Sequence, residues 1–282
     1  MLNKIKEMRY FLSKIFFMGL LVITASPSVS YNVYGGVSET MTQEDVLKLI
    51  DRINRQHYNI ASLGKTNVLM RCKSGFINSL ANQAKDGALA KDLKGADFLV
   101  EWKKGRGFTI KVENMPSRDS NEIANQGVMQ ILSGTKDMML GSFQIISFTF
   151  NGLYPDDVTQ KLSAAKKNEY TVLSLLDLSK GTAEKFYFNN DYRLIKSELL
   201  QGEKVVSETN FEFMKQKQTF YLTKVRVFFP QNRTGMVLNV KYKDFSGVLI
   251  PASFHGATIT GSKEQVLPQS IFQVIGADVK MQ

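Results

Sequence analysis

The sequence is poor in the residue types that most catalytic and metal sites require. It has one cysteine and two histidines among 282 residues. Because Cys72 stands alone, no internal disulfide can form, and no cysteine lies at the predicted cleavage region near residue 30 to accept a lipid. His57 and His255 lie far apart in the chain and match no metal-ligand spacing such as His-Glu-x-x-His. We therefore predict no metal, no cofactor and no catalytic residue.

The common catalytic and nucleotide-binding motifs are also missing. The sequence has no Gly-x-Ser-x-Gly elbow and no Gly-x-x-x-x-Gly-Lys-Ser/Thr loop. Gly105-Arg106-Gly107 lacks the third glycine of a dinucleotide fingerprint, so we interpret it as a turn. A non-enzymatic protein is the prediction. The alternative, a lipid-modifying hydrolase, would need a site assembled from scattered residues such as His255.

Long apolar runs are scarce too, apart from one near the N-terminus. A basic segment up to Lys14 precedes the apolar residues 15–25, and small residues follow at 26–30. This pattern predicts a secretory signal peptide over residues 1–30, a mature chain that begins near Tyr31, and export to the periplasm. The alternative is an uncleaved anchor whose span begins at Tyr10.

Acidic residues are fewer than basic ones, and the net charge is +10. A basic surface suits an anionic membrane face, lipid head groups or an acidic partner. The Lys and Arg residues are scattered along the predicted strands instead of forming a dense block, so we predict no nucleic-acid partner.

What the sequence has in quantity is alternation of apolar and polar residues, which is typical of half-buried antiparallel strands. Residues 183–261 contain a series of such strands joined by short turns, and residues 98–113 predict a hairpin. Further strands are predicted at 65–72, 128–132, 142–150, 171–176 and 270–280. Helices are predicted at 41–58, 74–97 and 155–168, and a loop at 115–126. We expect residues 31–282 to form one mainly β domain.

The order of these elements resembles the LolA/LolB-like lipoprotein-localisation family. The likeness rests on Val100-Glu101-Trp102-Lys103-Lys104, on residues 186–198 with Asn190-Asp191-Tyr192-Arg193, and on residues 240–245 with the following Gly247-Val248-Leu249-Ile250-Pro251. It covers most of residues 42–280. The resemblance implies an incomplete antiparallel β-barrel (a long curved sheet) around a hydrophobic cavity, covered by lid helices.

The same resemblance implies a monomeric periplasmic carrier or sensor that binds the acyl chains of lipoproteins or lipids, with peripheral membrane contact and an inner-membrane transporter as a partner. Where carriers of the family often have Arg-Pro at the basic turn, this chain has Lys103-Lys104-Gly105-Arg106. The candidates for the lid and its latch are Phe76, Leu80, Lys104 and Arg106.

Strand alternation places candidate cavity residues on a common face of the sheet. They are Trp102, Phe108, Ile110, Phe211, Phe213, Tyr221, Val225, Leu238 and Val240. The alternative function is an interaction or scaffold protein of the cell envelope with the same fold and a filled core.

Overall fold

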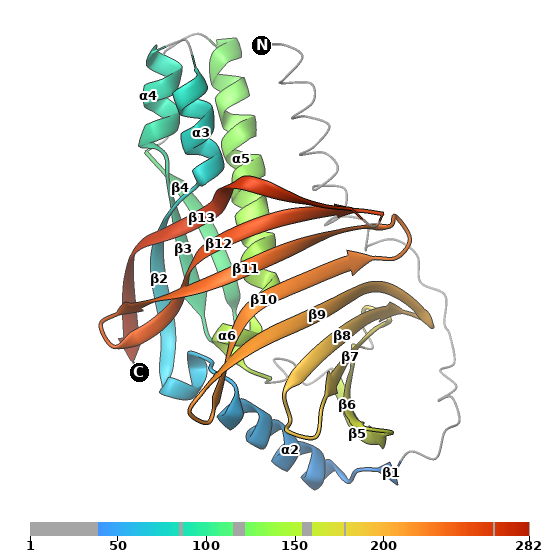
Figure 1. Ribbon diagram of the computed structural model, residues 1–282. Helices are drawn as coiled ribbons and strands as arrows, with labels where there is room; N and C mark the ends of the chain where they lie inside the picture. Colours follow the sequence, from blue (N-terminus) through green and yellow to red (C-terminus); the bar gives the residue numbers. More distant parts are fainter. Residues whose placement is uncertain are drawn as a thin grey trace.

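The predicted strands pair into one long antiparallel sheet (Figure 1). The computed structural model describes residues 39–84, 87–114, 122–153, 160–177, 179–261 and 263–281, so the predicted signal peptide lies outside the described residues. The strand order is β1-β5-β6-β7-β8-β9-β10-β11-β12-β13-β2-β3-β4. Among the described strands, the end strands β1 and β4 do not pair with each other, so the sheet is not closed.

The strand bounds are as follows: β1 Glu39–Thr40, β2 Lys65–Lys73, β3 Asp97–Lys103, β4 Gly107–Glu113, β5 Gln160–Lys167, β6 Tyr170–Asp177, β7 Thr182–Phe188, β8 Leu194–Gln201, β9 Lys204–Gln216, β10 Thr219–Phe229, β11 Thr234–Phe245, β12 Val248–Thr260 and β13 Lys263–Met281. The helices are α2 Gln43–Gln56, α3 Gly75–Gln83, α4 Gly87–Gly95, α5 Glu122–Ile145 and α6 Phe148–Asn151, with a 3-10 turn at Ala61–Leu63.

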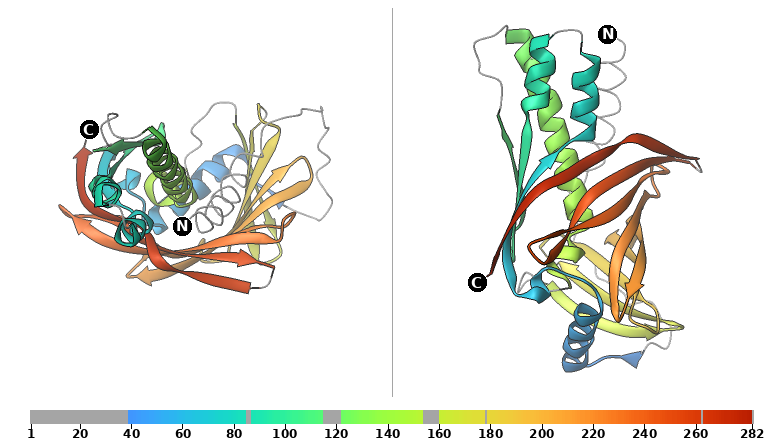
Figure 2. Two further views of the ribbon diagram at one scale, coloured as in Figure 1. Left: turned by 90° about the horizontal axis from the view of Figure 1, so that it is seen from above. Right: turned by 60° about the vertical axis from the view of Figure 1, so that its left-hand side comes forward.

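Helices α2 and α5 lie on the inner side of the curved sheet (Figure 2), and we call the sheet face that they contact the inner face. Two hydrophobic clusters result. The larger one joins α5 and α6 to β2–β4 and β10–β13, and the smaller one joins α2 to β5–β8. Helices α3 and α4 pack beside the N-terminal part of α5, beyond the ends of the strands (Figure 1).

Helix α2 confirms the helix predicted at 41–58, and Thr42 caps it. The Thr42 hydroxyl accepts a hydrogen bond from the backbone N–H of Asp45 at 3.2 Å and donates to the Asp45 carboxylate at 2.7 Å. Such a cap satisfies backbone donors that the first helical turn leaves without partners. The buried stripe of the helix, which includes Val46, Leu49 and Ile53, faces the sheet because these residues recur at helical spacing.

The predicted hairpin at residues 98–113 is confirmed as β3 and β4. Trp102 pairs with Phe108 and Val100 with Ile110 across the two strands. The turn contains Gly105 and Gly107, both at φ 72°, a left-handed conformation that glycine adopts without steric cost.

Helix α5 corrects the sequence interpretation. The loop predicted at 115–126 lies partly outside the described residues, and the strands predicted at 128–132 and 142–150 are wrong, because α5 and α6 occupy that region. The buried residues of α5 recur at helical spacing, as Val128, Leu132, Met139 and Phe143 illustrate. The Ser133-Gly134 pair, which resembles a turn in the sequence, lies inside the helix.

Strand β5 is the second correction. The sequence predicts a helix over 155–168, of which residues 155–159 lie outside the described residues. Gln160–Lys167 instead pairs along its whole length with β6. Strand β5 pairs with β6 on one edge and with β1 on the other, so both edges of its backbone have hydrogen-bonding partners. This pairing stabilises a strand more than the weak local helix propensity stabilises a helix.

Gly235 is required by the close approach of β10 and β11. A Cβ atom at this position would lie 2.3 Å from the Val227 carbonyl oxygen, which is part of the neighbouring strand. We expect Gly235→Ala to lower the free energy of unfolding by about 1–3 kcal/mol, since the strands must move apart. Gly276→Ala in β13 is the matched control, because a Cβ atom at that position would have no neighbour within 4 Å. Urea unfolding measures the free energy of unfolding of both variants, and equal values for the two would contradict the prediction.

Candidate functional site

The inner face of the sheet carries most of the predicted cavity residues, and over β10–β13 and β2–β4 it is covered. Trp102, Val225 and Leu238 have no exposed surface, and Val240 is 5% exposed. Phe108 and Ile110 are partly buried against the same cluster. The residues therefore share a face, as alternation predicted, but the protein's own helices pack on them.

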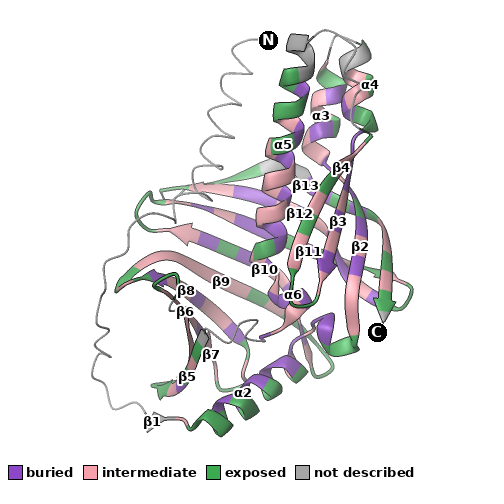
Figure 3. Ribbon diagram, turned by 180° about the vertical axis from the view of Figure 1, so that it is seen from behind, coloured by how far each residue is buried: buried purple, intermediate pink, exposed green. Residues whose placement is uncertain are grey.

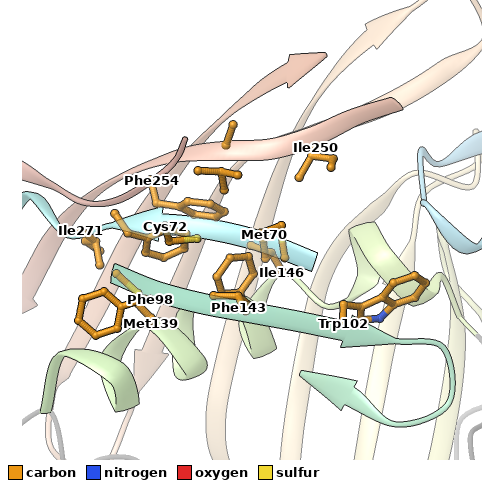
Figure 4. Close-up of a cluster of buried hydrophobic side chains, with 14 of the residues drawn as sticks. Met70, Cys72, Phe98, Trp102, Met139, Phe143, Ile146, Ile250, Phe254 and Ile271 are labelled. Carbon is orange, nitrogen blue, oxygen red and sulfur yellow. The ribbon is translucent and has the colours of Figure 1, made fainter. Parts of the chain in front are cut away.

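The C-terminal half of α5 supplies the covering side chains (Figure 4). Phe143 lies with its ring centroid 4.7 Å from Phe272, 5.1 Å from Phe108 and 5.6 Å from Phe254. Met139 and Ile146 are also fully buried in this region. This half of the inner face is a packed hydrophobic core.

Trp102 is held in that core by a polar contact as well as by packing. Its indole Nε1 donates a hydrogen bond to Asn151 Oδ1 at 2.9 Å, and Phe150 lies 5.7 Å away between ring centroids. Both partners belong to α6. A buried indole N–H normally needs such an acceptor, so Asn151 fixes the ring against the sheet.

Strand β9 differs from the rest of the inner face. Of its thirteen described residues none is fully buried, although both edges of the strand are paired. Ser207, Thr209, Phe211 and Phe213 share its inner side, since they pair with inner residues of β8 and β10. Figure 3 shows the strand as intermediate along most of its length. The predicted residues Phe211 and Phe213 therefore line a strip between α2 and α5 that the described residues cover only in part, with the Phe213 ring centroid 5.0 Å from that of His57 and 6.5 Å from that of Phe148.

Tyr221 lies on the other face of β10. Phe213 pairs with Leu222 and Phe211 pairs with Val225, with a bulge between Leu222 and Lys224. Leu222 thus shares the inner face with Val225, and its neighbour Tyr221 points away, because adjacent strand residues alternate. Tyr221 instead stacks on Tyr58 with centroids 5.0 Å apart. The single extra residue of the bulge explains the difference from prediction.

The fold does not bring the predicted lid residues close to the predicted latch residues. Phe76 and Leu80 lie on α3, which follows the end of β2 where Cys72 pairs with Phe98. Lys104 and Arg106 lie in the turn at the opposite end of β3. The whole length of β3 separates the two pairs.

Glu184 of β7 is a site residue that the sequence analysis missed. It pairs with Leu175 of β6 and Leu199 of β8, so it lies in an apolar row of the inner face that reaches Ser207 of β9 through Leu199. Burial raises the pKa of Glu184 to about 7, and the Ser197 hydroxyl offsets part of that shift by hydrogen bonding. The sequence did contain a signal for this residue: Glu184 alternates with Phe186 and Phe188, so it is a charged residue in an otherwise apolar series.

The surroundings of His57, at the C-terminal end of α2, and of Cys72 indicate a structural role for both residues. His57 Nδ1 lies 3.0 Å from the Ile53 carbonyl, and its Nε2 accepts the Leu194 N–H at 3.2 Å. Burial lowers the pKa of His57 to about 4. Burial also raises the pKa of the Cys72 thiol, which disfavours the reactive thiolate.

His255, the residue on which the hydrolase alternative depended, lies on the outer face of β12 opposite Asn239. Its Nδ1 is 3.5 Å from the Ser253 hydroxyl, the outer limit for a hydrogen bond. Within the part of the chain that the structure describes, no group of three or more His, Cys, Asp or Glu side chains could hold a metal ion.

The chain matches no protein-family model, no curated protein and no solved structure. The resemblance to the LolA/LolB-like family therefore stays a prediction, and the function must be argued from the geometry alone. Among the described helices, none combines the length and apolar character needed to cross a membrane.

Proposed function

We propose that this protein binds the acyl chains of lipids or lipoproteins along the strip at β9 that the described residues cover only in part, as a non-enzymatic periplasmic carrier or sensor. In this proposal the sheet is an incomplete barrel, and α2 and α5 cover the inner face on either side of the strip. An acylated lipoprotein or a lipid is the cargo, and an inner-membrane transporter is a partner that could load it.

The observation that carries the proposal is the exposure of β9. A strand in the interior of a long sheet would normally bury one face, because apolar side chains of a sheet pack against a covering layer. Phe211 and Phe213 remain only partly buried. From Ser207 to Phe213 the strip runs for roughly 20 Å. This exceeds the depth of one leaflet of a bilayer core, about 15 Å.

The neighbouring strands extend this apolar surface. Leu175 and Leu199 are partly exposed beside it, with Glu184 between them. Burying a hydrocarbon chain against such a surface is favourable by about 25 cal/mol for each Å² of apolar area removed from water. Glu184 offers a polar contact whose charge changes near neutral pH.

The test uses a fluorescent polyene fatty acid whose emission rises in an apolar site. We expect the wild-type protein to bind it, and Thr209→Asp to raise the Kd at least tenfold, because a bound chain would remove water from an unpaired carboxylate. Asn210→Asp is the matched control. It adds the same charge at the next residue but on the outer face, opposite Lys196 and Arg226, and should change the Kd less than twofold.

Two results would contradict the proposal: no binding by the wild type, or equal weakening by both variants. The first would favour the alternative, an interaction or scaffold protein. One observation supports that alternative already, since α5 fills the other half of the inner face with Phe143 and its neighbours. Trp102 emission should not respond to the probe, because Trp102 belongs to the filled half.

A further inference from the structure

A pocket of about 270 Å³ opens on the outer face of the sheet, away from α2. Its position follows from strand pairing: Val172, Tyr187, Lys196 and Asn210 are successive partners across β6, β7, β8 and β9. This row alternates with the inner row that contains Phe186 and Ser197. The pocket is lined by Lys167, Asn168, Tyr170, Val172, Tyr187, Ile195, Lys196 and Asn210.

A β-bulge creates the hollow. Tyr187 pairs with Lys196 and Phe188 pairs with Leu194, which leaves Ile195 as an extra residue in β8. In a bulge the extra residue bends the strand and redirects a side chain, and here Ile195 joins Lys196 in the pocket lining.

Two sets of hydrogen bonds hold the backbone that precedes the bulge. On the inner side, His57 Nε2 accepts the Leu194 N–H at 3.2 Å. In the preceding turn, Asn189 Oδ1 accepts the backbone N–H groups of Asp191 at 3.1 Å and Arg193 at 2.9 Å. Specific hydrogen bonds therefore hold the backbone that leads into the pocket lining at Ile195 and Lys196.

The polar groups of the pocket are aligned before any ligand binds. Lys196 Nζ lies 2.7 Å from Glu198 and 3.1 Å from Glu208. The Tyr187 hydroxyl donates to Glu198 at 2.6 Å, and Asn210 Nδ2 lies 3.5 Å from Glu208. A network of this kind loses little entropy on binding, because its side chains are already ordered.

The lining combines an apolar floor with amides and cations. Val172, Ile195 and the Tyr187 ring offer surface for weakly polar C–H groups, which favour the negative face of an aromatic ring. Asn168 and Asn210 offer amide donors and acceptors, and Lys167 adds a positive charge. A sugar ring has both kinds of surface, with C–H groups on its faces and hydroxyl groups around its edge.

We propose that this pocket binds one ring of an acidic saccharide, with the carboxylate of the sugar toward Lys167. The size of the pocket suits a single ring, since sites for larger ligands usually span roughly 300–1,000 Å³. The site is separate from the inner strip, so the proposal does not rest on acyl-chain binding.

Saturation-transfer NMR with D-glucuronate as the probe and D-glucose as the comparison tests the proposal. We expect transfer to glucuronate that exceeds transfer to glucose, and at least a fivefold weaker glucuronate affinity in Lys167→Ala and Asn210→Asp. Asn239→Asp is the matched control for the second variant. It adds the same charge to the exposed outer face of β11, outside the pocket, and should leave the affinity within twofold.

The proposal is overturned if neither sugar receives saturation, if both sugars bind equally, or if Asn239→Asp weakens binding as much as Asn210→Asp. The last result would mean that overall charge, and not the pocket, attracts the ligand. Thr209→Asp should leave glucuronate binding unchanged, because Thr209 lies on the inner face. Failure of this proposal and failure of acyl-chain binding are thus distinguishable.

Discussion

Phe143→Ala is expected to lower the free energy of unfolding by about 3–5 kcal/mol, the usual cost of removing a fully buried phenylalanine. Phe143 has no exposed surface, and its ring contacts Phe108 of β4, Phe254 of β12 and Phe272 of β13. Its removal therefore leaves a cavity between α5, the neighbouring strands β12 and β13, and the end strand β4, which β2 and β3 separate from β13 in the sheet order.

Urea unfolding followed by Trp102 emission measures this loss. Trp102 is the only tryptophan and is fully buried in the same cluster, so its emission reports the opening of this core. Met129→Ala is the matched control on the same helix, because Met129 is 42% exposed. We expect it to change the stability by about 0.5 kcal/mol or less. A cost below about 1 kcal/mol for Phe143→Ala would mean that α5 does not form this core.

The second large effect concerns His57 and pH. Burial lowers the pKa of His57 to about 4, and the nearby positive charge of Arg193 acts in the same direction. In the unfolded chain the pKa returns to about 6.5. The unfolded state therefore binds the proton more readily between these values, and stability falls as the pH decreases from 6.5 to 4.

A shift of this size corresponds to roughly 3 kcal/mol. Burial of the ring is the main cause of the lowered pKa. A proton on Nε2 would in addition remove the acceptor of the Leu194 N–H. The measurement is urea unfolding at pH values from 7.5 to 4. His57→Gln removes the titrating group and should flatten the curve in this window, even if the variant is less stable throughout.

His255→Gln is the matched control, since it removes the other imidazole from the outer face of β12 and leaves the buried site unchanged. The difference between the two variants isolates His57 from the carboxyl groups that also titrate. If both variants followed the wild-type curve, His57 would not be responsible for the loss of stability.

Local pattern predicted much of the fold because strand alternation and turn residues are local properties. The hairpin at Trp102 and Phe108, the capped helix α2 and the meander from β7 to β12 all follow from periodicity and turn chemistry. The strands predicted within residues 122–151 are wrong, because short apolar segments next to Ser133-Gly134 fit strands as well as helices. The buried residues there do follow helical spacing.

The candidate site was predicted less well than the fold. Trp102, Val225, Leu238 and Val240 do share a face, as alternation requires, but their partner is α5. The face predicted for Tyr221 is wrong because a bulge shifts the alternation by one residue, and bulges have no reliable local signal.

The sequence by itself determined where most of the strands form and which of their faces are apolar. The tertiary structure decided which parts of the apolar face are covered. Phe143 and Phe211 have the same chemistry, yet one is sealed in the core and the other is left partly exposed on β9. The difference depends on where α5 and α2 lie across the sheet, and that placement is set by contacts between residues distant in the chain, which no local pattern contains.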